Sequence, residues 1–142
     1  MRQTGTLLLK QTVNNEPTHS PAGRILCVED DRDTCDVLRF VMTDFEFTAV
    51  HTVNDAVRLI ETETFDLFVL DNWLPDGSGV ELCKQIRSSG ISAPIIFTSA
   101  ISQRKDIDMA VDAGADRYLV KPYEPERLIN TVKELLAPSA QV

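Results

Sequence analysis

The apolar residues of this chain follow two alternating patterns from Arg24 onward. Short continuous apolar runs predict strands at residues 25–28, 47–52, 65–70, 95–98 and 117–120. Stretches with apolar residues at helical spacing follow these runs and predict helices at 33–43, 54–60, 80–87, 103–113 and 124–136. Strands and helices in regular alternation are typical of a parallel sheet with helices on both faces.

Only a few topologies suit such a chain. Crossovers between parallel strands are right-handed, and a sheet of five strands most often takes the order 2-1-3-4-5. We therefore expect an α/β fold: a three-layer, doubly wound (βα)5 domain with a five-stranded parallel sheet of flavodoxin-like order. In open sheets of this kind, ligands bind beyond the carboxyl ends of the strands.

The helical stretches carry their own end signals. Asn54 is placed to cap the second helix, and Gly90 and Gly114 follow the third and fourth helices where a C-cap glycine belongs. Periodicity predicts that the first helix buries Val37, Leu38, Val41 and Met42, and that the second buries Ala56, Val57 and Ile60.

The two ends of the chain lack this periodicity. Residues 14–21 are polar and include two prolines, so we expect residues 1–22 to form a disordered tail. The folded domain is expected at 23–137, with a short C-terminal tail at 138–142. Since nothing after Leu136 is long enough to bind DNA or catalyse a reaction, a single-domain protein is expected.

Charge and cysteine content narrow the function classes. The net charge of −8 argues against nucleic-acid or anionic-membrane binding and is compatible with a divalent-cation site. No apolar segment approaches the ~20 residues of a membrane-spanning helix, and the apolar run at 7–9 is too short for a secretory signal. Three cysteines without paired spacing indicate free thiols, which favours a reducing, cytoplasmic location.

Polar side chains stand at the carboxyl ends of four predicted strands. Glu29 and Asp30 follow the first strand, Asp71 the third, Ser99 the fourth and Lys121 the fifth. These strands are neighbours in the order 2-1-3-4-5, so we expect the groups to converge on one crevice. Each feature alone is more often a helix cap or a turn residue, and it is the combination that indicates a site.

The converging groups suit phosphoryl chemistry. Crowded carboxylates repel one another unless a cation compensates, and Mg²⁺ prefers such oxygen ligands. A hydroxyl and an ammonium group stabilise the oxygens of a transferring phosphoryl group. A carboxylate can itself act as the nucleophile and form an acyl phosphate. The residue types at the strand ends are therefore compatible with phosphoryl chemistry beside a divalent cation.

With these residues in place, the chain resembles the response-regulator receiver domain, the phosphoacceptor half of two-component signalling. The resemblance covers residues 23–137 and is closest to the single-domain, chemotaxis-regulator-like type. It rests on Val28-Glu29-Asp30-Asp31, Leu70-Asp71 with Pro75 and Gly79, Pro94 to Ala100, Asp112 to Asp116, and Tyr118 to Pro122.

The resemblance implies a role for each acidic residue. Asp71 is implied to accept a phosphoryl group from a phosphohistidine on a sensor histidine kinase or a phosphotransfer protein. Asp30 and Asp71 are implied to bind Mg²⁺ directly, Glu29 through water, and Trp73 through its backbone carbonyl. The protein would then catalyse only its own phosphoryl transfer and dephosphorylation, and would not be an enzyme acting on other substrates.

The resemblance also implies a switch. Ser99 would bond the phosphoryl group, and Lys121, preceding a cis bond to Pro122, would pair with it. Tyr118 would swing inward as Ser99 moves. The surface of the fourth helix, fifth strand and fifth helix would then change and signal to a downstream protein partner.

Three positions depart from the family pattern. Ser99 stands where threonine is usual, and Trp73 is unusually large for the second position after the acceptor. Arg117 stands where the dimerising transcription-factor branch commonly has an acidic residue, so the dimer of that branch is not carried over. The oligomeric state stays open.

Three alternatives remain. A flavodoxin-type cofactor binder would need a phosphate-binding loop where Glu29 and Asp30 stand, and these would repel phosphate. An aspartyl-phosphate phosphatase would carry a second aspartate where Trp73 stands. A phosphorylation-independent, receiver-like binding module would need none of the groups at the strand ends.

Overall fold

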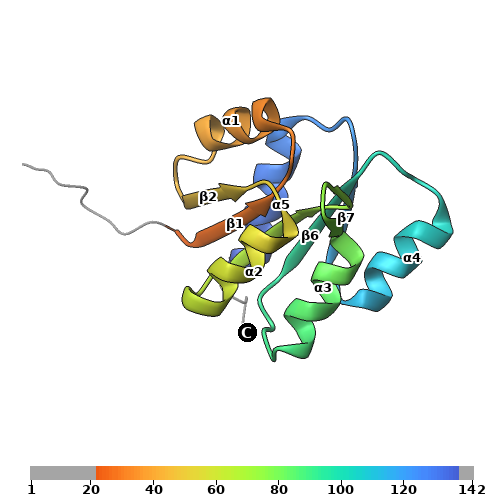
Figure 1. The fold of residues 1–142 in the computed structure, drawn as a ribbon. Helices are drawn as coiled ribbons and strands as arrows, with labels where there is room; N and C mark the ends of the chain where they lie inside the picture. Colours follow the sequence, from red (N-terminus) through yellow and green to blue (C-terminus); the bar gives the residue numbers. More distant parts are fainter. Residues whose placement is uncertain (1–21, 138–142) are drawn as a thin grey trace, which may run out of the picture.

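One parallel sheet forms the centre of the molecule. The computed structural model describes residues 22–137. Its five-stranded sheet has the order β2-β1-β3-β6-β7, which confirms the expected 2-1-3-4-5 arrangement (Figure 1). The strands are β1 (Arg24–Val28), β2 (Glu46–Val50), β3 (Leu67–Asp71), β6 (Ile95–Ser99) and β7 (Arg117–Val120). The predicted tails at 1–21 and 138–142 lie outside the described residues.

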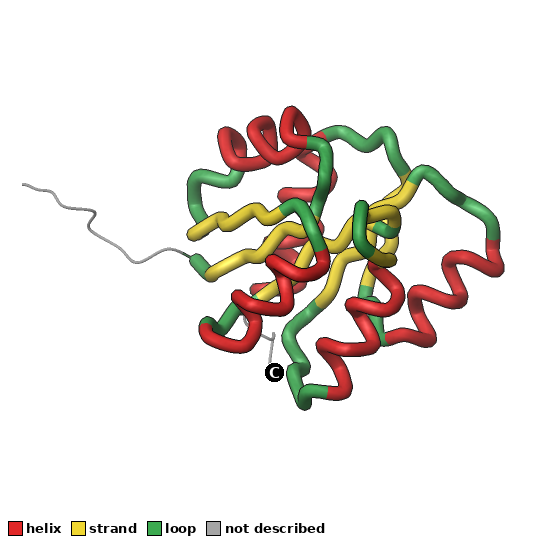
Figure 2. The backbone as a smooth tube through the Cα atoms, viewed as in Figure 1, coloured by secondary structure: helices red, strands yellow, loops and turns green. Residues whose placement is uncertain are grey.

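Helices cover both faces of this sheet. They are α1 (Arg32–Val41), α2 (Val53–Thr62), α3 (Gly79–Ser88), α4 (Arg104–Ala113) and α5 (Pro125–Leu136). Helices α1 and α5 lie on one face and α2, α3 and α4 on the other (Figure 2). None of the helices in residues 22–137 has the length and apolar character that a membrane crossing requires.

The central strands are apolar at successive positions and do not alternate between apolar and polar residues, because both faces of the sheet are buried. Successive residues of a strand point to opposite faces, and both faces are covered by helices. Leu26 and Leu70 accordingly pack toward α2, α3 and α4, whereas Cys27 and Val69 pack toward α1 and α5. Every residue of β3 and of β6 is buried, so the ends of these two strands are held rigidly in the sheet.

Two predictions about the helices are wrong. Thr52 caps α2, because its hydroxyl oxygen accepts a hydrogen bond from the Asp55 backbone N–H, and Asn54 lies inside the helix. Val37 is 48% exposed, because the buried face of α1 is centred on Leu38 and is narrower than the apolar stripe in the sequence.

A small hairpin that the sequence pattern did not indicate follows β3. Strand β4 (Trp73–Leu74) pairs antiparallel with β5 (Gly77–Ser78). At its turn, the carboxylate of Asp76 accepts hydrogen bonds from the backbone N–H groups of Val53 (2.7 Å) and Asn54 (3.0 Å). These bonds lower the pKa of Asp76 and fasten the loop after Asp71 to the start of α2.

The side chain of Arg87 on α3 binds the segments that precede β6 and β7. The guanidinium group of Arg87 donates hydrogen bonds to the backbone carbonyls of Ile91, Ala93 and Gly114, and pairs with the carboxylate of Asp116 at 3.0 Å. Gly114 has the left-handed φ of 118° that its place after α4 predicted, and a Cβ atom there would collide with the Arg87 side chain.

Candidate functional site

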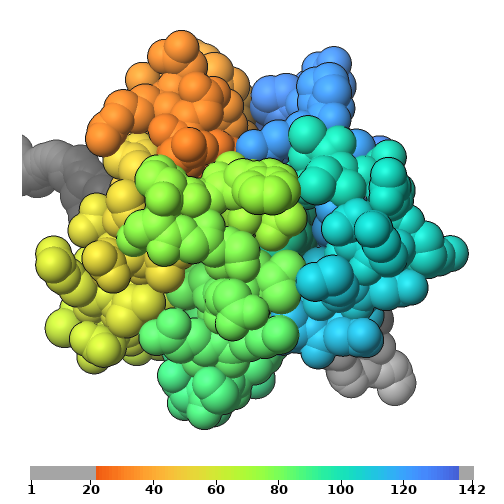
Figure 3. Space-filling view, turned by 45° about the vertical axis from the view of Figure 1, so that its right-hand side comes forward, coloured from red at the N-terminus to blue at the C-terminus, as the bar shows by residue number. Residues whose placement is uncertain are grey.

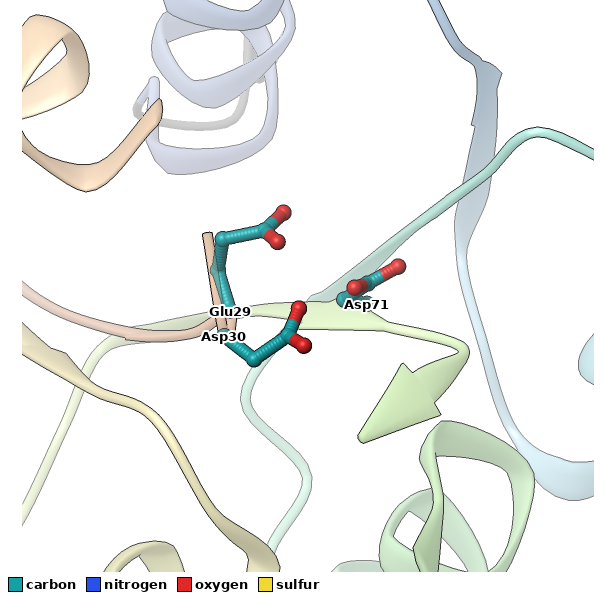
Figure 4. Close-up of side chains that lie close together, drawn as sticks. All are labelled: Glu29, Asp30 and Asp71. Atoms are coloured by element: carbon teal, nitrogen blue, oxygen red, sulfur yellow. The ribbon is translucent and has the colours of Figure 1, made fainter. Parts of the chain in front are cut away.

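Three carboxylates meet at the carboxyl ends of β1 and β3. Glu29 and Asp30 directly follow β1, and Asp71 is the last residue of β3. One oxygen from each lies within 4.8 Å of the others, and Figure 4 shows the three groups gathered around one space. Glu29 is 3% and Asp71 5% exposed, whereas Asp30 is exposed. The convergence predicted from strand order is confirmed.

Both carboxylate oxygens of Glu29 already have partners. Oε1 accepts a hydrogen bond from Lys121 Nζ at 2.9 Å, and Oε2 accepts one from the Asp31 backbone N–H at 3.1 Å. The Glu29 carbonyl oxygen accepts from His51 Nδ1 at 2.9 Å and from the Cys35 thiol at 3.5 Å. Glu29 is therefore fixed in place, which fits an indirect, water-mediated contact with a cation better than a direct one.

Lys121 connects the carboxylates across the sheet. Its Nζ lies 3.2 Å from Asp71 Oδ1 and 2.9 Å from Glu29 Oε1. Its backbone N–H donates to the Ser99 carbonyl at 2.8 Å, which places the base of the side chain at the end of β6. Burial by itself lowers the pKa of Lys121, but the hydrogen bond to Glu29 and the charge of Asp71 outweigh it, so the pKa is raised and the ammonium stays charged.

The electrostatics favour a cation beside Asp71. Burial and the Glu29 carboxylate together raise the pKa of Asp71 to about 6, against the opposing effect of Lys121. Among residues 22–137, three carboxylates face the ammonium group of Lys121 here, so negative charge is in excess. Carboxylate oxygens are the ligands that Mg²⁺ prefers, and the exposed Asp30 leaves room for water ligands. The donor set therefore fits a hard divalent cation.

The start of α3 presses against the backbone of Asp71. A Cβ atom at position 79 would collide with the Asp71 carbonyl oxygen, so only glycine permits this approach. The Gly79 N–H donates a hydrogen bond to the Asn72 carbonyl oxygen at 2.9 Å, and the Asn72 N–H donates one to the Thr98 carbonyl oxygen at 3.1 Å. The carboxylate of Asp71 thus projects from a backbone that is held on both sides.

Ser99 and Tyr118 are joined through one residue. Ser99 is fully buried at the end of β6, and its hydroxyl oxygen accepts a hydrogen bond from the Ile101 N–H at 3.1 Å. The Tyr118 hydroxyl donates to the Ile101 carbonyl at 2.7 Å, while its ring stacks on Phe97 with centroids 5.8 Å apart. Ser99 and Tyr118 thus contact the N–H and the carbonyl group of the same residue, Ile101.

Trp73 lies at the rim of the site. Its side chain is 66% exposed and lines a groove of about 240 Å³ with Ile101 and Met109. The cis peptide bond between Lys121 and Pro122, implied by the resemblance, is present. The role of the Trp73 backbone carbonyl as a cation ligand stays a prediction.

Some site contacts had no signal in the sequence. His51 and Cys35 donate hydrogen bonds to the Glu29 carbonyl oxygen, and the backbone N–H of Asp31 donates to the Glu29 carboxylate. The Thr98 hydroxyl donates to the Leu70 carbonyl oxygen at 3.5 Å. In each contact at least one partner is a main-chain atom, which any residue type supplies. Only the fold reveals such contacts.

Comparison with known proteins agrees with this geometry. Residues 25–133 match the family model of the response regulator receiver domain. The transcriptional regulatory protein DltR of Streptococcus agalactiae is 33% identical over 112 residues, covering 78% of this chain and 50% of DltR. The alkaline phosphatase synthesis transcriptional regulatory protein PhoP of Bacillus subtilis is 31% identical over 127 residues, covering 84% and 53%. The chain spans about half the length of these relatives.

Solved structures give the same result. A CheY-like response regulator receiver domain protein from Methanospirillum hungatei JF-1 superposes with a TM-score of 0.75 at 30% identity, covering 80% of this chain and 92% of that one. A two-component response regulator from Clostridium difficile has a TM-score of 0.77 at 30% identity, covering 83% and 98%.

Proposed function

Because this chain belongs to the response-regulator receiver-domain family of two-component signalling, we propose that Asp71 accepts a phosphoryl group from a sensor histidine kinase or a phosphotransfer protein. The observation that carries the proposal is the placement of Asp71: a carboxylate 5% exposed at the end of a central strand, with Lys121 Nζ at 3.2 Å. A buried carboxylate with a fixed backbone and a positive group beside it suits a nucleophile.

The proposed transfer is a single displacement at phosphorus. An Asp71 carboxylate oxygen attacks phosphorus, an O–P bond forms, and the N–P bond of the donor phosphohistidine breaks with the electron pair returning to the imidazole. Lys121 stabilises the negative charge of the equatorial phosphoryl oxygens, and the Ser99 hydroxyl donates to one of them after leaving Ile101. With a pKa of about 6, Asp71 is mostly ionised at neutral pH and is a competent nucleophile.

Mg²⁺ is the proposed cofactor. Asp30 and Asp71 would hold it directly, Trp73 through its backbone carbonyl and Glu29 through water, in keeping with the occupied carboxylate oxygens of Glu29. When bound, the ion supplies positive charge to the phosphoryl oxygens and relieves the repulsion among the carboxylates. Asp30, the exposed member of the cluster, is the residue whose removal weakens this site with least damage to the fold.

The proposed output is a change in the surface formed by α4, β7 and α5, which binds a downstream protein. The hydrogen bonds that join Ser99, Ile101 and Tyr118 support this proposal, because they connect the phosphoryl site to β7. When Ser99 turns toward the phosphoryl group, Ile101 loses its partner and the Tyr118 ring is free to move inward.

The set of groups around Asp71 favours phosphoryl acceptance over a phosphorylation-independent binding module. A binding module has no need of three crowded carboxylates and a paired lysine, whose burial costs folding free energy. The protein would act only on its own aspartyl phosphate and would work in the cytoplasm beside its kinase.

The test is labelling by acetyl phosphate, followed by intact-protein mass spectrometry with and without Mg²⁺. Wild type should gain a hydroxylamine-sensitive phosphoryl group that depends on Mg²⁺, and Asp71→Asn should gain none. Asp112→Asn, a substitution of an exposed carboxylate on α4, is the matched control and should label like wild type. Labelling of Asp71→Asn at wild-type stoichiometry would show that the acceptor is another residue.

A further inference from the structure

A groove that shares Lys121 with the proposed phosphoryl site lies between α1 and the loop after β7. It has a volume of about 540 Å³ and is lined mainly by apolar surface, including Val37, Leu38, Pro122, Tyr123 and Pro125, and also by Asp31, Asp33 and Lys121. In Figure 3, α1 (orange) and the start of the α5 region (blue) meet at the top of the molecule, where this groove opens.

The outer face of α1 extends this groove with apolar surface. Phe40 is 81% exposed and Val37 48% exposed. They stand three residues apart on the helix, so their side chains are neighbours on one face. Phe40, Val37 and the apolar lining of the groove thus form neighbouring apolar surface, and contiguous apolar surface is where proteins bind partners.

The chain itself contains an occupant of suitable chemistry. Residues 7–10 read Leu7-Leu8-Leu9-Lys10, three consecutive large apolar side chains followed by a basic one. The groove offers apolar walls and two acidic lining residues, Asp31 and Asp33. Residues 1–21 carry one net positive charge, from Arg2, Lys10 and Glu16, in a chain whose net charge is −8. Charge and apolarity are therefore complementary.

The point of attachment brings this segment within reach. The Ala22 backbone N–H donates to the Asp44 carbonyl at 2.8 Å, just beyond the C-terminal end of α1. Helix α1 has 10 residues and spans about 15 Å from there back to the groove. The residues between Lys10 and Ala22 reach about 40 Å when extended, so they cross this distance easily.

We propose that the Leu7–Lys10 segment of the same chain docks on Val37 and Phe40 and into the groove between α1 and the loop after β7. The inference goes beyond the proposed function, because docking of the segment does not require phosphorylation.

The experiment compares backbone amide NMR spectra of the full chain with those of a Leu7→Ser, Leu8→Ser, Leu9→Ser variant. Docking predicts shift differences along α1 and at residues 121–125. Val13→Ser, which removes an apolar residue outside the leucine run, is the control and should leave those amides unchanged. The reverse variant, Phe40→Ser, should shift the amides of residues 7–10, whereas Val111→Ser, which changes a residue 53% exposed on α4, should not.

Two outcomes would overturn the proposal. If the serine variant changes only amides within residues 1–21, the segment does not touch the groove. If the α1 shifts in wild type depend on protein concentration, the occupant is a second copy and not the same chain.

Discussion

The Nζ atom of Lys121 lies 3.2 Å from Oδ1 of Asp71, although the two residues are fifty positions apart in the chain. Asp71 ends β3, and Lys121 follows β7, which β6 separates from β3. Lys121 also reaches Glu29 at 2.9 Å, so one ammonium group neutralises part of the charge on two buried carboxylates. Its removal therefore affects both the nucleophile and the carboxylate beside it.

Lys121→Ala should still be labelled by acetyl phosphate, but about tenfold more slowly, because about 1.4 kcal/mol of transition-state stabilisation is lost. It should also fail to switch, so hydrogen exchange around residues 100–123 should not change on phosphorylation. Lys133→Ala, which removes an exposed lysine that pairs with Asp44 at 3.7 Å, should behave like wild type in both assays. A wild-type rate in Lys121→Ala would exclude a role for this ammonium group in the transfer.

Stability should depend on pH through Asp71. Its pKa is raised by burial and by Glu29 from 3.8 to about 6, so the folded state holds this proton more tightly than the unfolded state. The penalty on folding therefore grows as pH rises from the unfolded pKa of 3.8 and is complete above the folded pKa of about 6. In EDTA near pH 7.5, Asp71→Asn should be more stable than wild type by about 1–3 kcal/mol.

Urea denaturation at several pH values measures this difference. It should shrink as pH falls through the range between the two pKa values and approach zero below about pH 3, where wild-type Asp71 is largely protonated in both states. Saturating Mg²⁺ at neutral pH should also reduce it, because the ion stabilises only the wild-type carboxylate cluster. Asp112→Asn should show no such pH dependence. An Asp71→Asn variant less stable than wild type at every pH would mean that the Lys121 ion pair outweighs the burial of charge.

Mg²⁺ binding should be visible in the fluorescence of Trp73, the single tryptophan of the chain. Its side chain is 66% exposed and stands two residues after Asp71, at the rim of the carboxylate cluster. Titration with Mg²⁺ should change the emission of wild type and of Asp112→Asn, but not that of Asp30→Asn. The same response in Asp30→Asn as in wild type would place the ion elsewhere.

The sequence predicted well whatever depends on local pattern and strand order. Apolar runs and helical spacing located each main strand and helix, and the strand order alone brought Glu29, Asp30, Asp71 and Lys121 together. The convergence could be predicted because the carboxyl ends of neighbouring parallel strands share one edge.

Contacts set by tertiary structure could not be predicted. Asp76 caps a helix that begins 23 residues earlier, and Arg87 binds a carbonyl 27 residues later. Such pairs produce no periodic pattern in the sequence, because the partner of the carboxylate or guanidinium group is a main-chain atom, which every residue carries. The exposure of Val37 was missed for a related reason, since periodicity defines a stripe but not how much of it the sheet covers.

Arg87 gives a test of those hidden contacts. Arg87→Lys should destabilise the fold by about 1–3 kcal/mol, because an ammonium group cannot serve the carbonyls of Ile91, Ala93 and Gly114 at once. Arg104→Lys, at an exposed arginine 4.0 Å from Asp108, should change stability by less than about 0.5 kcal/mol. Urea denaturation of the two variants makes the comparison, and equal effects would show that the Arg87 contacts contribute little.

The aspartyl phosphate should have a long intrinsic lifetime. The acyl phosphate is lost when a water molecule attacks phosphorus in line with the Asp71 oxygen, so the rate depends on how well that water is held. Trp73 and Ile101 line one groove beside the site, and neither side chain offers a carboxylate or amide to orient a water there. We therefore expect a slow intrinsic loss of label and a dependence on a partner for reset.

The variant Trp73→Asn with Ile101→Glu places polar groups at both positions and should lose its label faster, by about 10- to 100-fold for a well-positioned water. The first-order loss of label after removal of acetyl phosphate measures this rate. Met109→Leu, which changes a third residue of the same groove without adding a polar group, is the matched control and should keep the wild-type rate. Because Trp73 is 66% exposed, its ring has room to stand clear of the line of attack, and a double variant that decays no faster than wild type would show that it does so.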